Sequence, residues 1–235
     1  MPNPDQAAPT PSTVALLSEL SQCVQRLVII SGRDTDYLVA RLPRLHALLV
    51  GNHGLEQRDD GASRILAEAQ PYLAPLQRAS DAVEALTEGR AEGITVERKR
   101  ATVSVHFRKA TDPAAASAML QPVLQDIARR ERLQLQPGRQ VWELRPPIEL
   151  DKGEVLRRLA ADLRPAGIVY VGDDRTDASA FSALRRMARR PRTVAVGVRS
   201  AEVPGEVFVD CDLMVDGVLG VIVLLEQLLD LCAGA

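Results

Sequence analysis

The sequence predicts an α/β protein with a doubly wound parallel sheet and an inserted α+β unit. Toward both ends of the chain, short and wholly apolar runs alternate with amphipathic segments. Strands covered by helices on both faces show such runs, and helix–strand alternation is typical of a doubly wound sheet. In the middle of the chain, apolar and polar residues alternate instead, which is the pattern of half-exposed strands.

The composition is that of a folded globular protein. Of 235 residues, 46% are hydrophobic and 26% are charged, with a formal net charge of −2. These values exclude a disordered, collagen-like or coiled-coil chain. A near-neutral chain is not a strongly basic nucleic-acid binder, so we expect no nucleic-acid partner.

The sequence also predicts a cytoplasmic protein without a membrane partner. The longest apolar run, residues 217–225, is too short to span a bilayer. The first residues lack the basic stretch and apolar core of a secretory signal. Three widely spaced cysteines are neither a disulfide framework nor a zinc site, and they fit a reducing compartment.

Residues 1–60 are predicted to form the first part of the sheet domain. Ser12 and Thr13 precede an apolar-periodic segment as helix caps, and Asp34 can cap a second helix. We expect helices over residues 14–20 and 37–42, and buried strands over residues 27–30 and 48–50.

Residues 61–147 are predicted to form the inserted α+β unit. A helical segment over 63–87 comes before two alternating strands, and a second helix comes before two more. The second helix starts near a proline and ends in arginines, as helices commonly do. The remaining predicted elements are strands 94–98 and 102–108, helix 113–130, and strands 133–136 and 140–144.

Residues 148–235 return to helix–strand alternation and complete the predicted sheet domain. The apolar run over 167–171 ends at Gly172-Asp173-Asp174 and is predicted to be a buried strand. The other predicted elements are helices 153–163, 178–188 and 218–231 and strands 193–198 and 214–215.

Three polar clusters are predicted at the carboxyl edge of the sheet, where ligands of doubly wound folds bind. Ser31-Gly32-Arg33 offers a hydroxyl, backbone amides and a guanidinium, and Lys152-Gly153 places an ammonium where a helix begins. The run from Gly172 to Asp177 holds three carboxylates that repel one another unless a proton or a hard cation compensates. Anion donors opposite a magnesium-binding carboxylate group indicate phosphoryl transfer.

Each cluster also has a simpler explanation. Ser31-Gly32-Arg33 is compatible with an ordinary turn, and Lys152-Gly153 with a surface feature. Asp174 or Thr176 could cap the next helix, but capping does not require three carboxylates. The three clusters together favour the functional interpretation.

At these motifs the sequence resembles the trehalose-6-phosphate phosphatases of the haloacid dehalogenase-like superfamily. The resemblance extends from about Pro4 to Leu229. Besides the three clusters, of which Gly172-Asp173-Asp174-Arg175-Thr176-Asp177 is the third, the matching motifs are Gly51-Asn52-His53-Gly54-Leu55-Glu56, His106-Phe107-Arg108 and Glu143-Leu144-Arg145-Pro146.

The resemblance implies a role for each group of residues. Ser31 and Lys152 would hold the phosphate, and Asp173, supported by Asp174 and Asp177, would bind Mg²⁺. The inserted unit would be a cap that closes over the sugar of trehalose 6-phosphate. The implied substrate-binding residues are Arg33, His53, Glu56, Lys99, His106, Arg108, Glu143 and Arg145.

For the substrate-binding residues, structural alternatives stay open. His106 and Arg108 share one face of a predicted strand, which could simply be the solvated face. Glu143 and Arg145 have the same spacing, so a cross-strand salt bridge competes with a binding role. Lys99 could lie at a solvated hairpin tip, and His53 could be a loop histidine.

The family's Asp-x-Asp-Gly-Thr motif, which carries the nucleophile and the general acid/base, does not occur in this sequence. Either the start of the chain is misplaced or cut away, or the protein is a natural homologue without the nucleophile; fold physics favours the first. The strand with that motif lies at the sheet centre in the superfamily, between the strands around Ile29 and Val169. If the sheet persists, these two strands should lie two spacings apart, about 9–10 Å, rather than pair at about 4.8 Å.

Three functions compete. The first is a magnesium-dependent trehalose-6-phosphate phosphatase, with the 235-residue chain itself inactive because the nucleophile is absent. The second is a sugar-phosphate-binding protein without catalysis, and the third is a related phosphatase for a different sugar.

Overall fold

The computed structural model describes residues 8–87, 92–187, 191–200 and 203–233. The beginning of the resembling segment at Pro4 and the end of the predicted helix at Ala188 therefore lie outside the described residues. The chain forms two compact units. We call them the core unit (Met1–Gly54, Arg58–Ala62 and Leu150–Ala235) and the inserted unit (Leu55–Gln57 and Ser63–Glu149).

The first half of the core unit follows the predicted alternation. Its elements are α1 (Pro11–Cys23), β1 (Val28–Ile30), α2 (Thr35–Arg41), β2 (Leu48–Gly51) and the 3₁₀ turn η2 (Asn52–Gly54). Asp34 caps α2 as predicted, accepting a hydrogen bond from the Tyr37 amide. Thr10, rather than Ser12 or Thr13, caps α1. β1 and β2 are parallel, with Ile29 opposite Leu49.

A hairpin replaces the start of the helix that was expected from residue 63. β3 (Glu56–Asp59) and β4 (Ala62–Ile65) precede the 3₁₀ segment η3 (Ala67–Tyr72), and the α-helix begins only at Leu73. The turn residues Asp60 and Gly61 both have positive φ, which suits a tight two-residue hairpin turn. The sheet order is β1-β2-β3-β4.

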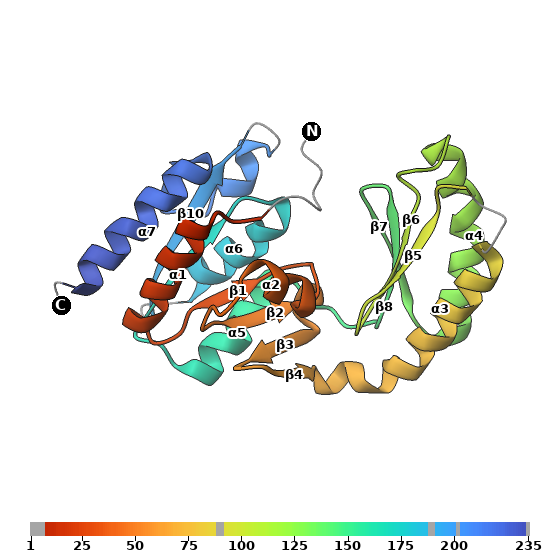
Figure 1. The fold of residues 1–235 in the computed structure, drawn as a ribbon, viewed down its shortest axis with the longest axis horizontal. Helices are drawn as coiled ribbons and strands as arrows, with labels where there is room; N and C mark the ends of the chain where they lie inside the picture. The colour runs from red at the N-terminus through yellow and green to blue at the C-terminus, as the bar shows by residue number, and fades with distance from the viewer. Residues whose placement is uncertain (1–7, 88–91, 188–190, 201–202, 234–235) are drawn as a thin grey trace. The chain divides into compact units, whose positions relative to one another are not determined.

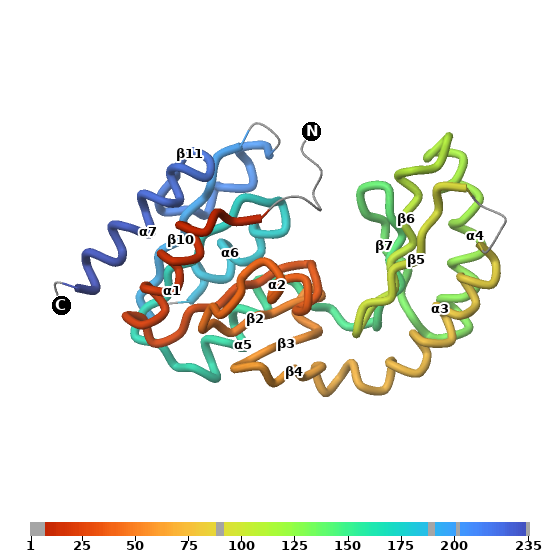
Figure 2. Tube along the Cα trace, in the orientation of Figure 1, coloured from red at the N-terminus to blue at the C-terminus, as the bar shows by residue number. Residues whose placement is uncertain are grey.

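The second half of the core unit carries a three-stranded parallel sheet in the order β11-β10-β9. Its elements are α5 (Lys152–Leu163), β9 (Gly167–Gly172), η4 (Arg175–Asp177), α6 (Ala178–Arg186), β10 (Arg192–Arg199), η5 (Gly205–Phe208), β11 (Leu213–Asp216) and α7 (Gly217–Ala233). Helix α5 packs on α6, and α1 packs on α7 (Figure 1). The trace in Figure 2 places β11 beside β10 and the start of α7.

Among the described strands of the core unit, β1 and β9 belong to different sheets and do not pair. A cavity of about 580 Å³ is lined by residues of both strands and by α1, α5 and α7. The sheet has therefore not closed up by direct pairing of β1 with β9, in agreement with the expected gap. The core unit retains a space between its two parallel half-sheets.

The two half-sheets point in the same direction. Beside their amino ends, the Gln25 side chain donates a hydrogen bond to the Leu163 carbonyl (2.8 Å). At their carboxyl ends, α5 contacts both η2, which follows β2, and η4, which follows β9. The polar segments after β1, β2 and β9 are thus at one rim of the core unit.

The inserted unit is a four-stranded antiparallel sheet with two helices on one face. Its elements are α3 (Leu73–Thr87), β5 (Thr95–Arg98), β6 (Val103–His106), α4 (Pro113–Glu131), β7 (Gln134–Gly138) and β8 (Val141–Arg145), and the strand order is β5-β6-β8-β7. One sheet face, with Val103, Val105 and Leu144, packs in a core with Leu124 and Ile127 of α4.

None of the helices described is long and apolar enough to cross a membrane.

Candidate functional site

The Ser31-Gly32-Arg33 loop follows β1 and lies against the loop that follows β2. The Ser31 amide donates to the Val50 carbonyl (2.9 Å), and the Ser31 hydroxyl accepts from the Arg33 amide (3.1 Å). The Arg33 guanidinium stacks on the Tyr37 ring at 4.8 Å. The loop is therefore a fixed turn whose Ser31 hydroxyl lies at the carboxyl edge of the sheet.

His53 packs onto this loop from β2. Its amide donates to the Ser31 carbonyl (3.2 Å), and its ring lies so close to Gly32 that an added Cβ there would be 2.6 Å from Cε1. Both Asn52 and His53 have left-handed φ values, of 48° and 56°. Such strained backbone is held only where the surroundings impose it, as at binding sites. The structure thus brings together Ser31, Arg33 and His53.

Lys152 opens α5 at the same rim. Asp151 caps the helix by accepting from the Glu154 amide (2.7 Å). Gly153 allows α5 to approach α6, since a Cβ at this position would lie 2.4 Å from the Ser179 carbonyl oxygen. The close packing places the Lys152 ammonium beside the residues that follow β9.

Asp177 connects Lys152 to this acidic segment and is almost completely buried, with 2% of its surface exposed. Its Oδ1 accepts from Lys152 Nζ and from the Tyr170 hydroxyl, each at 2.6 Å. Its Oδ2 accepts from the amides of Asp173 (2.9 Å) and Asp174 (2.8 Å). Four donors occupy this carboxylate, so it organises the segment after β9.

The other two carboxylates of the segment have different environments. Asp174 caps η4, accepting from the Arg175 amide (2.6 Å) and the Thr176 hydroxyl (3.3 Å). Asp173 lines the cavity beside β9. Its pKa is raised, mainly by burial and then by the charge of Asp177, while Lys152 acts in the opposite direction.

These environments bear on the predicted Mg²⁺ site. Among the described residues, no three His, Cys, Asp or Glu side chains are grouped so as to hold a metal ion. Burial first, and the charge of Asp177 second, raise the pKa of Asp173, and a bound cation would act in the opposite direction by stabilising the charged carboxylate. Magnesium is commonly bound through one or two carboxylates, with waters and phosphate oxygens as further ligands. Asp173 fits such a ligand, whereas both oxygens of Asp177 are occupied by protein donors.

Tyr170 is a part of this site that the motif analysis did not single out. It faces α6, where its ring makes an edge contact with Phe181 at 5.7 Å. Burial, followed by the charge of Asp177, raises the pKa of the Tyr170 hydroxyl, so it stays protonated and donates to that carboxylate. In the sequence, the signal that could have indicated this role is a tyrosine two residues before Gly172 in an otherwise aliphatic strand.

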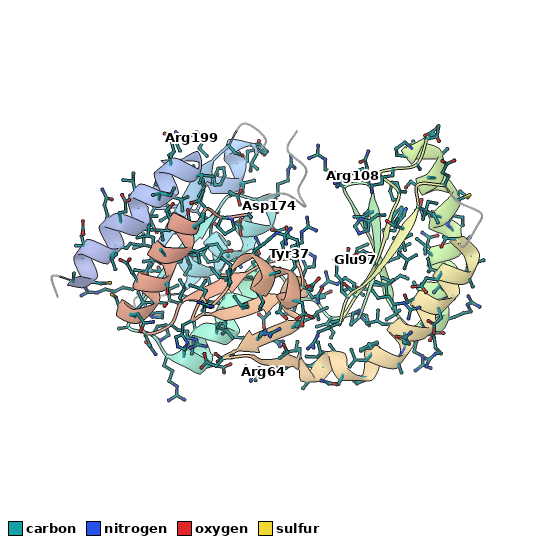
Figure 3. The ribbon with its side chains drawn as sticks, viewed as in Figure 1. Tyr37, Arg64, Glu97, Arg108, Asp174 and Arg199 are labelled. Carbon is teal, nitrogen blue, oxygen red and sulfur yellow. The ribbon has the colours of Figure 1, made fainter. Side chains whose placement is uncertain are left out.

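The remaining predicted site residues lie in the inserted unit, on or beside the sheet face opposite the helices. The strand register places Glu97, Ser104, Glu143 and Gln136 in one row across β5, β6, β8 and β7. The alternation along each strand thus separates an apolar face for α3 and α4 from this polar face. Glu97 is labelled on β5 in Figure 3.

Glu143 is the centre of a hydrogen-bond network on this face. Its Oε1 accepts from Lys99 Nζ (3.2 Å), Thr102 Oγ1 (3.3 Å) and Ser104 Oγ (3.2 Å). The Lys99 and Glu143 side chains are only 9% and 13% exposed. The Lys99 side chain is therefore not solvated. The sequence motifs did not single out the two hydroxyl donors, Thr102 and Ser104.

Arg145 is the next residue of β8 on this polar face, and it is only 5% exposed. Its Nη1 donates to Gln136 (3.1 Å), while its Nε is buried without a hydrogen-bond partner in the described structure. Burial lowers the pKa of this guanidinium, opposed by the charge of Glu143. The guanidinium of Arg145 thus donates a hydrogen bond to Gln136, whereas a salt bridge between Arg145 and Glu143 was the structural alternative considered from the sequence.

Three further predicted residues are held separately in the inserted unit. His106 pairs with Glu97 (2.8 Å), and the fully buried Glu56 lies 3.5 Å from the Arg100 guanidinium. Arg108 is exposed in the turn after β6 (Figure 3). The structure therefore groups Lys99, Glu143 and their hydroxyl donors, but places Glu56 and Arg108 outside that network.

Comparisons with known proteins agree with these motifs. A family model described as trehalose-phosphatase matches residues 1–213. The trehalose-phosphate phosphatase of Mycobacterium marinum (strain ATCC BAA-535 / M) is 34% identical over 206 residues, covering 85% of this chain and 50% of that protein. The chain spans about half the length of the curated relatives it matches.

Solved structures show the same fold at low sequence identity. The crystal structure of a "trehalose-6-phosphate phosphatase related protein" has a TM-score of 0.79 at 19% identity, covering 100% of this chain and 93% of that chain. A haloacid dehalogenase-like hydrolase from Bacteroides thetaiotaomicron has a TM-score of 0.55 at 16% identity, covering 92% of each chain. The predicted fold class, a haloacid dehalogenase-like α/β core with an inserted α+β unit, is confirmed.

The sequence motifs, the rim that joins Lys152 to the acidic segment, and the match over most of the chain lead to one assignment: the chain belongs to the trehalose-phosphatase family.

Proposed function

We propose that this chain forms the sugar-phosphate site of a magnesium-dependent trehalose-6-phosphate phosphatase. The observation that carries this proposal is the Lys152–Asp177 contact of 2.6 Å beside Asp173, at the carboxyl rim of the core sheet. An ammonium at a helix start, together with a carboxylate suited to a cation, is what a phosphate monoester with its counter-ion requires. The family membership supports this chemistry.

Within this proposal, each core-unit residue has a distinct task. Ser31 donates a hydrogen bond to a phosphate oxygen, and the Lys152 ammonium neutralises phosphate charge. Asp173 is the Mg²⁺ ligand, and Asp174 and Asp177 hold the loop that presents it. A bound Mg²⁺ would stabilise charge on the phosphoryl oxygens.

The inserted unit is proposed to be the cap that recognises the sugar. Polar side chains that are held in place by neighbours suit the binding of sugar hydroxyls, because their donors and acceptors are already oriented. The Glu143 network and Arg145, whose buried Nε has an unused donor, supply such groups. The proposed substrate-binding set is Arg33, His53, Glu56, Lys99, His106, Arg108, Glu143 and Arg145.

We further propose that the 235-residue chain binds the substrate without hydrolysing it. The sequence has no Asp-x-Asp-Gly-Thr motif, so no aspartate is supplied to form the aspartyl-phosphate of the family. The phosphate-holding and cap residues are present nevertheless, which favours binding without turnover as the second candidate function. We place this function in the cytoplasm, without a nucleic-acid or membrane partner.

Calorimetry and phosphate-release assays on the purified chain test this proposal together. With Mg²⁺ present, we expect saturable binding of trehalose 6-phosphate, much weaker binding of trehalose, and no phosphate release. Sucrose 6-phosphate and glucose 6-phosphate examine the choice of sugar. Binding should weaken strongly in Lys152→Met, but little in the matched Lys109→Met, since Lys109 is exposed outside the site.

Two results would contradict the proposal in different ways. Phosphate release by the 235-residue chain would overturn its inactivity, and equal binding of every sugar phosphate would overturn the specificity for trehalose 6-phosphate.

A further inference from the structure

Tyr37 lies in the first turn of α2, and two guanidinium groups lie over its ring. The Cζ atom of Arg33 is 4.8 Å from the ring centroid, and the Cζ atom of Arg41 is 3.8 Å from it. Both distances are within the range of about 6 Å over which an aromatic ring attracts a cation. Tyr37 is labelled in Figure 3. The ring of Tyr37 thus restricts where both guanidinium groups lie.

The ring itself is held in place by the way α2 starts and packs. Asp34 caps α2 by accepting a hydrogen bond from the Tyr37 amide (2.7 Å). The half-buried Tyr37 side chain packs against the apolar cluster of Leu38, Ala47 and Leu49. Because its backbone and its side chain both have fixed contacts, the ring can hold a second, more mobile side chain in position.

The backbone of Arg33 is also fixed, but its side chain is long. The Arg33 amide donates to the Ser31 hydroxyl (3.1 Å), and the Arg33 carbonyl accepts from the Asn52 amide (2.8 Å). An arginine side chain loses rotamer freedom when it binds an anion, and one that is already restricted loses less. The Tyr37 ring attracts the guanidinium without neutralising it, as a carboxylate would. Arg33 therefore keeps its positive charge for a ligand.

We propose that Tyr37 is a positioning residue that holds the Arg33 guanidinium ready for the phosphate group of the ligand. This inference rests on the proposed function, in which Arg33 belongs to the substrate-binding set. It adds Tyr37, which acts through Arg33 rather than on the substrate itself. Arg41 lies over the same ring, but it belongs to the last turn of α2, eight residues after Arg33. Removing the Arg41 guanidinium therefore provides a matched control.

The first measurement is made on the complete 235-residue chain without any ligand. ¹⁵N relaxation of the Arg33 Nε–H group reports the order of this side chain, and the signal is identified by its loss in Arg33→Met. We expect lower order in Tyr37→Leu, which removes the ring, and little change in Tyr37→Phe, which keeps it. Arg41→Met should leave the order of Arg33 unchanged. Tyr37→Met, which also lacks a ring, repeats the comparison with a second side chain.

The second measurement is the affinity for trehalose 6-phosphate, determined by calorimetry with Mg²⁺ at about 0.15 M salt, which screens distant charges. We expect Tyr37→Leu to weaken binding by about three- to tenfold, as the loss of a half-buried cation–π contact would. Tyr37→Phe and Arg41→Met should each bind within about twofold of the wild type.

A double-mutant cycle separates positioning of Arg33 from a general loosening of the fold. In the Arg33→Met background, Tyr37→Leu should cause no further loss of affinity, because the group that it positions is already gone. A general structural effect of Tyr37→Leu would instead weaken binding to the same extent in both backgrounds.

Several results would overturn the proposal. They are an unchanged order of Arg33 in Tyr37→Leu, an equal loss of affinity in Tyr37→Leu and Tyr37→Phe, and a loss that persists in full without the Arg33 guanidinium. Failure of the proposed function looks different, since the wild type itself would then bind no trehalose 6-phosphate. In that case the relaxation measurement alone decides whether Tyr37 orders Arg33.

Discussion

Lys152 Nζ and the Tyr170 hydroxyl meet at the same oxygen, Oδ1 of Asp177, each at 2.6 Å. The ammonium comes from the start of α5 and the hydroxyl from the middle of β9. Through Asp177, both are joined to the backbone amides of Asp173 and Asp174. One buried carboxylate thereby fixes the position of the ammonium relative to the loop proposed to hold a cation.

The first prediction is that removal of this carboxylate strongly destabilises the core unit. Asp177→Ala leaves a half-buried ammonium, a hydroxyl and two amides without their acceptor. We expect a loss of about 3–5 kcal/mol in the free energy of unfolding, measured by urea denaturation. Tyr170→Phe removes only one of the four donors and should cost about 1 kcal/mol.

Asp216→Ala is a suitable control because Asp216 forms an exposed pair with Arg199. Its effect should be within about 1 kcal/mol. If Asp177→Ala were as mild as this control, Asp177 would not organise the segment after β9.

The second prediction concerns the close packing of α5 and α6. Gly153→Ala places a Cβ 2.4 Å from the Ser179 carbonyl oxygen, so the helices must separate. We expect a destabilisation of about 1–3 kcal/mol in urea denaturation. Gly205→Ala is the matched control, because no described atom lies within 4 Å of the added Cβ, and its effect should be within about 0.5 kcal/mol. Equal effects of the two substitutions would contradict this prediction.

The third prediction concerns the pair of Lys99 and Glu143 in the inserted unit. Lys99→Met removes the ammonium from a largely buried carboxylate, which keeps the hydroxyl donors Thr102 and Ser104 among its partners. We expect a cost of about 3 kcal/mol, within the range for breaking a buried ion pair. Adding Glu143→Gln should recover part of this cost, because the uncompensated charge is removed.

A double-mutant cycle measures this coupling from the unfolding free energies of the wild type, both single variants and the double variant. If the two single effects simply add, the charges do not interact as the structure indicates.

The fourth prediction is a pH dependence of stability from the exposed contact between Glu84 and Arg98. The hydrogen bond from Arg98 lowers the pKa of Glu84 below its value of 4.5 in a model peptide. A lower pKa in the folded state means that the unfolded chain binds more protons. The stabilisation is therefore present above about pH 4.5 and is lost as the pH falls through the lower folded pKa.

Urea denaturation between pH 6 and pH 3 checks this sign. The stability difference between the wild type and Glu84→Gln should shrink as the pH decreases, and 1 M salt should reduce it at every pH. A difference that grows toward acid pH would show that the pKa is shifted the other way.

The fifth prediction is that Cys211 is a poorly reactive thiol. Burial, assisted by the nearby charges of Asp212 and Asp210, raises the pKa of Cys211 to about 11. Since the thiolate is the nucleophile, alkylation by iodoacetamide at pH 8 should be slow, and it should accelerate up to about pH 11. Cys23 is exposed and should react first. Peptide mass mapping after timed quenching identifies the modified residue, and unfolding in urea should remove the difference.

The sequence predicted most elements because their signals are local. The apolar runs ending at Ile30 and Val171 form parallel strands, and Asp34 caps its helix as expected. The helix expected from residue 63 was wrong at its start, where Ala62–Ile65 form β4; the 3₁₀ helix η3 (Ala67–Tyr72) and α3 follow. There the turn residues Asp60 and Gly61, with positive φ, allow a hairpin that adds to the sheet beyond β2. The periodicity of short segments does not distinguish these possibilities.

The sequence also predicted a set of residues for the candidate site, but not the contacts that these residues make with one another. The motifs singled out Lys152, Asp173 and Asp177, and all three residues line one cavity in the structure. The occupation of both Asp177 oxygens by protein donors, and the part of Tyr170 in this, appeared only in the structure. Likewise, the strand register rather than residue spacing made Ser104 a partner of Glu143.

The sequence by itself determined the fold class, the family and the set of polar motifs, because each depends on residue types within short stretches. Only the tertiary structure decided which carboxylate is held by protein donors and which one lines the cavity. It also decided that, within the part of the chain that the structure describes, β1 and β9 do not pair with each other. The physical reason is that hydrogen bonds between residues such as Lys152 and Asp177 depend on how α5, α6 and β9 pack together, and no local pattern encodes that geometry.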